Sequence, residues 1–149
     1  MDNKENVFFT PFVEDMLREG KTVQISLSGL SMFPFLMHGD IVLITSVTDK
    51  NLYKGAIVVF KINDRWIAHR LIKVDANNNL LYTRGDGKSI KDKPVKIEQI
   101  KGIVVKIVKS RWKLANFSIG KPAKIIAFLS PVTAPIFNFI IWGAGKVRK

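Results

Sequence analysis

A serine, a histidine and two aspartates occur along this chain where a hydrolytic triad could form. Ser31 lies in the run Ser-Gly-Leu-Ser-Met-Phe-Pro at 28–34, whose glycine and proline predict a tight turn between strands. Such a turn exposes a nucleophilic hydroxyl and directs backbone N–H groups towards a developing oxyanion. His69 follows in an expected strand, and Asp86 and Asp92 follow in turns. These are the groups used in serine-dependent acyl transfer.

The residue types alone leave the role of the histidine open. In the expected strand 65–74, side chains alternate, so Ile67, His69 and Leu71 share one face. A histidine among apolar neighbours is a natural general base near neutral pH. The alternative is a core histidine bonded to a backbone carbonyl. Either aspartate could be a surface carboxylate, or could bond the second histidine nitrogen and fix its tautomer. His38 is expected in a solvated loop.

The apolar pattern predicts a mainly β fold. Thr10-Pro11 is typical of a helix start and Gly20 of a helix end, so we expect a short amphipathic helix between them. Its expected apolar face consists of Phe12, Val13, Met16 and Leu17. The apolar period then changes to two, which predicts strands. These are expected at 23–27, 41–45, 55–62, 65–74, 80–84, 95–97 and 102–108. Short strands between turns favour a small antiparallel domain, either barrel-like or folded over on itself.

Composition excludes several classes of protein. The chain has 149 residues, of which 47% are hydrophobic and 24% charged, as expected for one globular domain rather than a disordered chain. It contains no cysteine, so disulfides, thiol catalysis and thiolate metal sites are excluded. Two histidines are too few for a His-rich metal site. We therefore expect neither a metal nor a cofactor.

Positive charge is concentrated near the C-terminus. The formal net charge is +12, and residues 99–149 contain 10 basic and no acidic side chains. This excess lies beside the uncharged apolar stretch 125–145. We therefore interpret it as contact with an anionic membrane surface through residues 121–149, and nucleic-acid binding as the less favoured reading. Pro131 and Pro135 interrupt the stretch, which favours interfacial helices or a re-entrant hairpin over a straight span. Packing of this tail on the domain core is the alternative.

Three parts of the chain are expected. They are an N-terminal amphipathic helix at 1–21, a catalytic β-domain at 22–115, and a basic-flanked hydrophobic tail at 116–149.

Four sequence blocks, taken in order, resemble the signal-peptidase and LexA-like clan of serine proteases. They are the run at 28–34 with Gly39-Asp40, Lys-Gly-Ala-Ile-Val-Val-Phe at 54–60, His69-Arg70, and Gly85-Asp86 with Asp92. The resemblance spans residues 22–108 and implies the small antiparallel β-domain of that clan. Many members have a lysine base where this chain has His69. In this respect the chain is similar to the endoplasmic-reticulum and archaeal type of signal peptidase, which some bacteria also have.

The resemblance also implies a role for each residue. Ser31 would be the nucleophile, His69 the base, Asp92 the triad carboxylate and Asp86 a supporting residue that holds its turn. Gly29 and the N–H of Ser31 would form the oxyanion turn, although signal peptidases usually have serine where Gly29 stands. Expected substrate-binding residues are Ile25, Leu27, Met32 and Pro34, with the strand before the serine pairing with an extended peptide.

The leading interpretation is a membrane-associated serine endopeptidase of a bacterial or archaeal cell membrane that cleaves a leader or signal-like peptide. A self-cleaving LexA-like protein is the first alternative, and its only typical cleavage pair would be Ala144-Gly145. A catalytically silent membrane- or peptide-binding module is the second. Because basic residues flank the tail on both sides, they leave the side of the membrane open.

Overall fold

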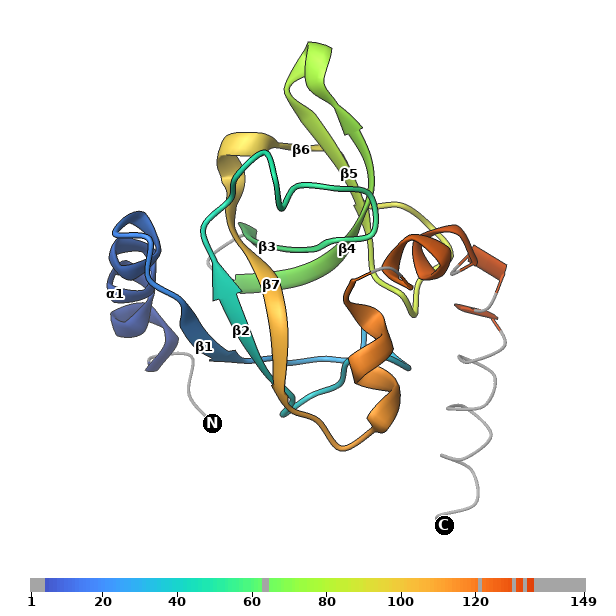
Figure 1. Ribbon diagram of the computed structural model, residues 1–149, viewed down its shortest axis with the longest axis horizontal. Helices are drawn as coiled ribbons and strands as arrows, with labels where there is room; N and C mark the ends of the chain where they lie inside the picture. Colours follow the sequence, from blue (N-terminus) through green and yellow to red (C-terminus); the bar gives the residue numbers. More distant parts are fainter. Residues whose placement is uncertain (1–4, 63–64, 121, 130, 133, 136–149) are drawn as a thin grey trace.

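Seven antiparallel strands form one sheet in the order β1-β2-β7-β3-β4-β5-β6 (Figure 1). The computed structural model describes residues 5–135 except 63–64, 121, 130 and 133. The strands are β1 (Val23–Ser26), β2 (Ile41–Thr45), β3 (Ile57–Ile62), β4 (Arg65–Asp75), β5 (Leu80–Arg84), β6 (Val95–Lys96) and β7 (Ile100–Lys109). The α-helix α1 (Glu5–Arg18) precedes them, and 3₁₀ turns occur at η1 (Ala76–Asn78), η2 (Ile97–Gln99) and η3 (Lys113–Ser118). The predicted mainly β fold with a short N-terminal helix is confirmed.

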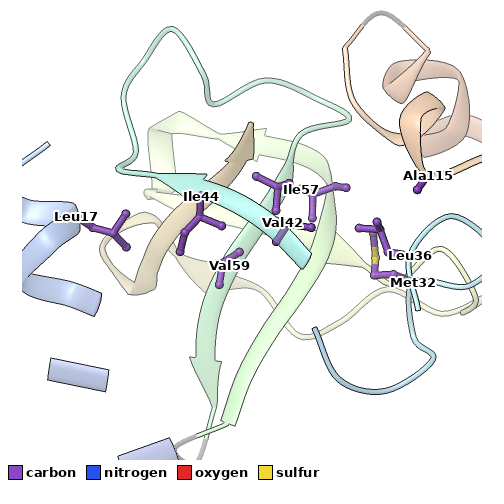
Figure 2. Packing of buried hydrophobic residues seen from close by; sticks show 9 residues of the cluster. Leu17, Met32, Leu36, Val42, Ile44, Ile57, Val59 and Ala115 are labelled. Carbon is purple, nitrogen blue, oxygen red and sulfur yellow. The ribbon is translucent and has the colours of Figure 1, made fainter. Parts of the chain in front are cut away.

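Alternation along the strands gives the sheet two apolar faces. On one face, a first cluster contains Leu17, Met32, Leu36, Val42, Ile44, Ile57, Val59, Val104 and Ala115 (Figure 2). A second cluster contains Ala56, Val58, Phe60, Leu71, Leu81, Val95, Ile100 and Ile103. Successive residues of β3 enter different clusters because neighbouring side chains of a strand point to opposite faces. The sheet is therefore buried on both sides, as a folded-over sheet requires.

Helix α1 starts earlier than the sequence predicts. It begins at Glu5, so the prediction that it starts at Thr10-Pro11 is wrong. Capping signals are weak where the surrounding chain favours continuing the helix. Leu17 is buried in the first cluster and Val13 packs against it. Phe12, predicted on the same apolar face, is instead 62% exposed. The last turns of the helix therefore cover one edge of the first cluster.

The chain after β7 packs on the sheet. We call residues 110–129 the C-terminal segment; it contains η3 and a helical stretch at 123–129. Ala115, Ser118 and Ala123 have no exposed surface, and Ala127 is 3% exposed. In Figure 1 this segment, orange to red, lies at the opposite end of the molecule from α1. The boundary expected near residue 116 therefore falls inside η3.

The predicted contact of residues 121–149 with a membrane surface stays a prediction. Residues 136–149, which make up much of the predicted apolar tail, lie outside the described residues. Within the described part of the chain, no helix is both long and apolar enough to cross a membrane.

Candidate active site

Ser31 lies on the loop between β1 and β2, residues 27–40, which we call the serine loop. Met32 and Leu36 are 4% and 1% exposed and anchor this loop in the first cluster. Leu30, on the other side of the serine, is 53% exposed. Gly29 has φ +86°, a left-handed conformation that glycine adopts without strain. The turn therefore leaves Ser31 half-buried, between a solvent-facing residue and a core residue.

Asp40 closes the serine loop at its far end. Its carboxylate is buried, and Oδ2 accepts hydrogen bonds from the Met37 N–H and the Ser110 hydroxyl, both at 2.9 Å. Its Oδ1 accepts from the Arg111 N–H at 3.3 Å. The aspartate of the Gly39-Asp40 block therefore also fastens the loop to the C-terminal segment.

The four expected substrate contacts differ in burial. Met32 and Pro34 are buried, and Met32 packs in the first cluster. Ile25 and Leu27 are half-buried and pack against the first cluster. Strand β1 lies at the edge of the sheet, where an extended peptide could pair with its backbone.

The turn Gly85-Asp86-Gly87 packs closely against the backbone of Ser31. The Gly87 N–H donates to the Ser31 carbonyl oxygen at 2.9 Å. A Cβ atom added at Gly85 would lie 2.3 Å from that oxygen, so only glycine fits here. Among the described residues, the Ser31 N–H donates no hydrogen bond and is available to an incoming oxyanion.

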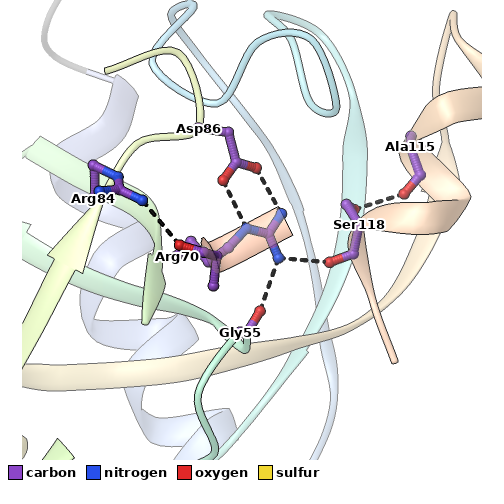
Figure 3. Close-up of polar contacts among 7 residues, drawn as sticks. Gly55, Arg70, Arg84, Asp86, Ala115 and Ser118 are labelled. Atoms are coloured by element: carbon purple, nitrogen blue, oxygen red, sulfur yellow. Dashed lines mark hydrogen bonds and ion pairs between the residues drawn. The ribbon is translucent and has the colours of Figure 1, made fainter. Parts of the chain in front are cut away.

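A buried ion pair holds this turn (Figure 3). The Nε and Nη2 atoms of Arg70 donate to the two carboxylate oxygens of Asp86, each at 2.6 Å. Nη1 of Arg70 donates to the carbonyl oxygens of Gly55 and Ser118, both at 2.8 Å. Neither side chain of the pair is exposed. Asp86, which the resemblance implies holds its turn, is thus bonded at both carboxylate oxygens by Arg70.

His69 and Asp92 lie together at the second cluster. Asp92 Oδ2 is 2.5 Å from His69 Nδ1 and also accepts a hydrogen bond from the Thr83 hydroxyl at 2.8 Å. His69 is 3% exposed, and its ring packs edge-on against Phe60. Its neighbours on the strand, Ile67 and Leu71, pack in the same cluster, as the alternation predicts. The carboxylate therefore holds the imidazole in one orientation.

The surroundings of Asp92 favour its charged form. Burial alone would raise the pKa of this carboxyl group, but hydrogen bonds from His69 and Thr83 and the charges of His69 and Lys88 outweigh it. The pKa of Asp92 is therefore lowered. Lys88 Nζ lies 3.9 Å from Oδ1 and is half exposed. Asp92 is thus an ionised hydrogen-bond acceptor for the imidazole at neutral pH.

The three predicted triad residues are not all in contact. Among the described residues, no hydrogen bond joins the Ser31 hydroxyl to His69, whereas His69 and Asp92 are paired. A cleft of about 390 Å³ opens beside this pair. It is lined by Phe60, Ile67, His69, Lys88, Asp92, Lys93, Pro94, Val95 and Gln99. Of the predicted triad, the described residues thus contain the His–Asp hydrogen bond but not the Ser–His one.

Sequence reasoning assigned no role to Thr83 or Arg84. Thr83 precedes Arg84 at the end of β5, and only the observed pairing reveals it as the second donor to Asp92. Arg84 Nη2 donates to the Ala127 carbonyl oxygen at 2.9 Å. Burial lowers the pKa of Arg84, although Asp86 and Asp92 act in the opposite direction. A backbone acceptor leaves no sequence signal, so this contact could not be predicted.

No group of three or more His, Cys, Asp or Glu side chains is placed to hold a metal ion in the part of the chain that is described.

The antiparallel β-domain and the serine turn fit the signal-peptidase and LexA-like clan to which the sequence blocks pointed, and His69 stands where many members of that clan have a lysine. The family model described as Peptidase S24-like matches residues 2–105. The chain belongs to this family. Comparisons with curated proteins and with solved structures found no match. The C-terminal segment lies outside the matched residues.

Proposed function

We propose that this chain is a serine endopeptidase in which Ser31 is the nucleophile, His69 the general base and Asp92 the residue that orients the base. The observation that carries the proposal is the Asp92 carboxylate on Nδ1 of a buried imidazole. With Nδ1 bonded, Nε2 is the nitrogen left to accept a proton. Such a pair is typical of serine hydrolases.

The steps follow from these groups. Ser31 Oγ attacks the scissile carbonyl carbon while His69 Nε2 accepts the hydroxyl proton, and Asp92 stabilises the resulting imidazolium. The Ser31 N–H donates to the oxyanion. The imidazolium then gives its proton to the leaving amine, and the acyl-enzyme forms. Water, deprotonated by His69, hydrolyses the ester and regenerates the serine.

Closure of the serine turn onto the histidine is part of this proposal. Catalytic hydrogen bonds are often long without substrate and shorten in the complex. An extended peptide beside β1 would place its scissile carbonyl near Ser31, because the serine loop directly follows this edge strand.

A fluorophosphonate probe tests the serine chemistry without knowledge of the substrate. We expect the wild type to be labelled on Ser31, and Ser31→Ala and His69→Ala to lose labelling. Ser28→Ala and His38→Ala are matched controls, because both residues are exposed and neither belongs to the proposed triad. Labelling that persists in Ser31→Ala, or an unlabelled wild type, would refute the proposal. Analysis of new protein N-termini in cells expressing the same variants would then define the cleavage site.

We further propose that the enzyme acts at an anionic membrane surface on a leader or signal-like peptide. Support comes from apolar side chains that remain exposed on and just after the C-terminal segment. They are Trp112, Leu114, Phe117, Ile125, Phe128, Leu129 and Val132. Lysines 113 and 124 lie among them and are also exposed. Apolar side chains interspersed with basic ones are typical of interfacial membrane contact.

Vesicle sedimentation tests the membrane surface. We expect the protein to bind vesicles of phosphatidylcholine with phosphatidylglycerol and to bind pure phosphatidylcholine less. Phe128→Ser should weaken binding, whereas Phe12→Ser, at an equally exposed phenylalanine on α1, should not. Equal binding by both variants and the wild type would contradict this surface. Binding to neither type of vesicle would favour a peptidase that acts away from membranes.

A further inference from the structure

We infer that the C-terminal segment, residues 110–129, is a positioning element. It holds the serine loop and the turn at 85–87, and so fixes the position of Ser31. The catalytic meaning of this inference rests on the proposed function. The segment lies outside the matched family region, and none of the contacts that follow involves a reacting atom. It fastens the site at three points.

The first point is the serine loop itself. Ser110 donates its hydroxyl hydrogen to Asp40 Oδ2 at 2.9 Å, and its Oγ accepts from the Trp112 N–H at 3.2 Å. The Trp112 ring packs edge-on against Phe33, with ring centroids 5.8 Å apart. Phe33 is buried and lies two residues after Ser31. The start of the segment therefore grips the loop on the C-terminal side of the serine.

The second point is the turn beneath the serine. Arg70 Nη1 donates to the Ser118 carbonyl oxygen while its other nitrogens hold Asp86 (Figure 3). Asp86 lies between the two glycines that contact the Ser31 carbonyl. If Ser118 moved away, a fully buried guanidinium would lose an acceptor, which is costly in a low-dielectric interior. The segment and the turn are therefore held by the same side chain.

The third point is the helical stretch 123–129. Arg84, next to Gly85, donates to the Ala127 carbonyl oxygen. A Cβ atom at Gly55 would lie 2.7 Å from the Ala123 carbonyl carbon, so the two backbones are in close contact. The Gly55 carbonyl oxygen also accepts from Arg70. The stretch 123–129 therefore bonds Arg84 directly, and it also contacts Gly55, which accepts a hydrogen bond from Arg70.

Fixing the serine matters because a displacement of about 1 Å from a distant change can cost ~10²-fold in rate. Loops that are held only locally exchange among conformations at little free-energy cost. The first contact point holds the chain after Ser31, and the other two hold the turn that is hydrogen-bonded to its carbonyl oxygen. They are therefore expected to limit its motion and raise the rate of the bond-forming step, with little effect on substrate affinity.

The double variant Ser110→Ala/Trp112→Ala in the full-length chain tests the inference. Trp112 is 44% exposed and Ser110 half-buried, so the core is left intact. Phe12→Ala is the matched control, at an aromatic residue of α1 that is 62% exposed and lies outside the segment and the proposed membrane surface. The single variant Trp112→Phe, which retains an aromatic ring against Phe33, should behave like the wild type.

Two readouts are compared. Hydrogen exchange is followed at the Phe33, Phe35 and Leu36 amides, which are bonded within the serine loop. Fluorophosphonate labelling gives a maximal rate and a half-saturating concentration. For the double variant we expect faster exchange at these amides and a maximal rate lower by about tenfold or more, with half-saturation little changed.

The outcomes separate the inference from the proposed function. Exchange and labelling equal to those of Phe12→Ala would overturn the inference, as would a change in half-saturation alone. Faster exchange in a protein whose wild type is never labelled would support the structural hold on the loop and refute the serine chemistry. Faster exchange with slower labelling supports both.

Discussion

At the scale of single residues, the hydrogen bonds to one carboxylate oxygen of Asp92 make the stability of the candidate site depend on pH. Asp92 Oδ2 accepts from both His69 and Thr83, and the pKa of Asp92 is lowered despite burial. A carboxyl group with a lowered folded-state pKa stabilises the fold above its unfolded-state pKa, about 4. This stabilisation is lost as the pH falls through the folded-state pKa.

We therefore predict a specific difference between wild type and Asp92→Asn. Below about pH 4, the free energy of unfolding should decrease more steeply for the wild type than for Asp92→Asn as the pH is lowered, because only the wild type takes up this proton. Urea unfolding from pH 6 to pH 2.5 measures the difference. Asp75→Asn, at a carboxylate outside the site, is the control. Parallel curves for wild type and Asp92→Asn would contradict the assigned contacts.

The Thr83 hydroxyl should contribute to the same titration. Thr83→Val retains the shape of this buried side chain and removes one donor to Asp92. The pKa of Asp92 should then rise towards its ordinary value, because a hydrogen bond to the charged form is lost. A carboxyl-carbon NMR titration measures this change. An unchanged titration would show that the hydroxyl does not act on the carboxylate.

At the scale of elements, the turn after β5 must approach the serine loop closely. Gly85→Ala would place a Cβ 2.3 Å from the Ser31 carbonyl oxygen, whereas Gly87→Ala meets its nearest atoms at 3.2 Å. Overpacking of this kind costs roughly 1–3 kcal/mol. We predict that Gly85→Ala loses more stability and more fluorophosphonate labelling than Gly87→Ala. The reverse order would show that the turn does not support the serine.

Helix α1 gives a second prediction at this scale. Leu17→Ala should destabilise the protein by about 2–5 kcal/mol, because a side chain buried in the first cluster leaves a cavity. Phe12→Ala on the same helix should change little, since Phe12 is 62% exposed. Thermal unfolding of the two variants makes the comparison. Equal losses would mean that the helix docks through a different face.

At the scale of the whole molecule, Arg70 joins four separate parts of the chain: β4, the turn at Asp86, the connection at Gly55 and the C-terminal segment at Ser118. Removing one partner of a buried ion pair typically costs about 3–5 kcal/mol. We predict a loss of this size for Asp86→Ala. Because the parts share one side chain, circular dichroism and hydrogen exchange in the C-terminal segment should report a single shared transition. Separate transitions would show that the segment is held independently.

The sequence predicted some parts of this molecule well for physical reasons. Strands β2 and β5 have the expected bounds because period-two patterns between turn residues leave few other solutions. The face shared by Ile67, His69 and Leu71 follows from the same alternation. Of the site, the residue pattern left open whether a carboxylate or a backbone carbonyl would bond the histidine. It could not choose between Asp86 and Asp92 by spacing, because partners far apart in the chain are brought together only by the sheet.

The missed features share a cause. The early start of α1 at Glu5 and the packing of the C-terminal segment depend on contacts with distant parts of the chain. The burial of Met32 likewise follows from how the serine loop folds back on the sheet. Local residue patterns carry no record of such contacts.

One consequence concerns how this segment can change over evolution. Arg70 and Arg84 bind it through the carbonyl oxygens of Ser118 and Ala127, and Gly55 contacts the backbone of Ala123. Every residue type supplies a carbonyl oxygen. Side chains that face away from the sheet are therefore free to diverge without loosening the grip. Relatives could therefore differ in the outer surface of this segment, and so in what it binds, while the serine loop and the His69–Asp92 pair stay the same.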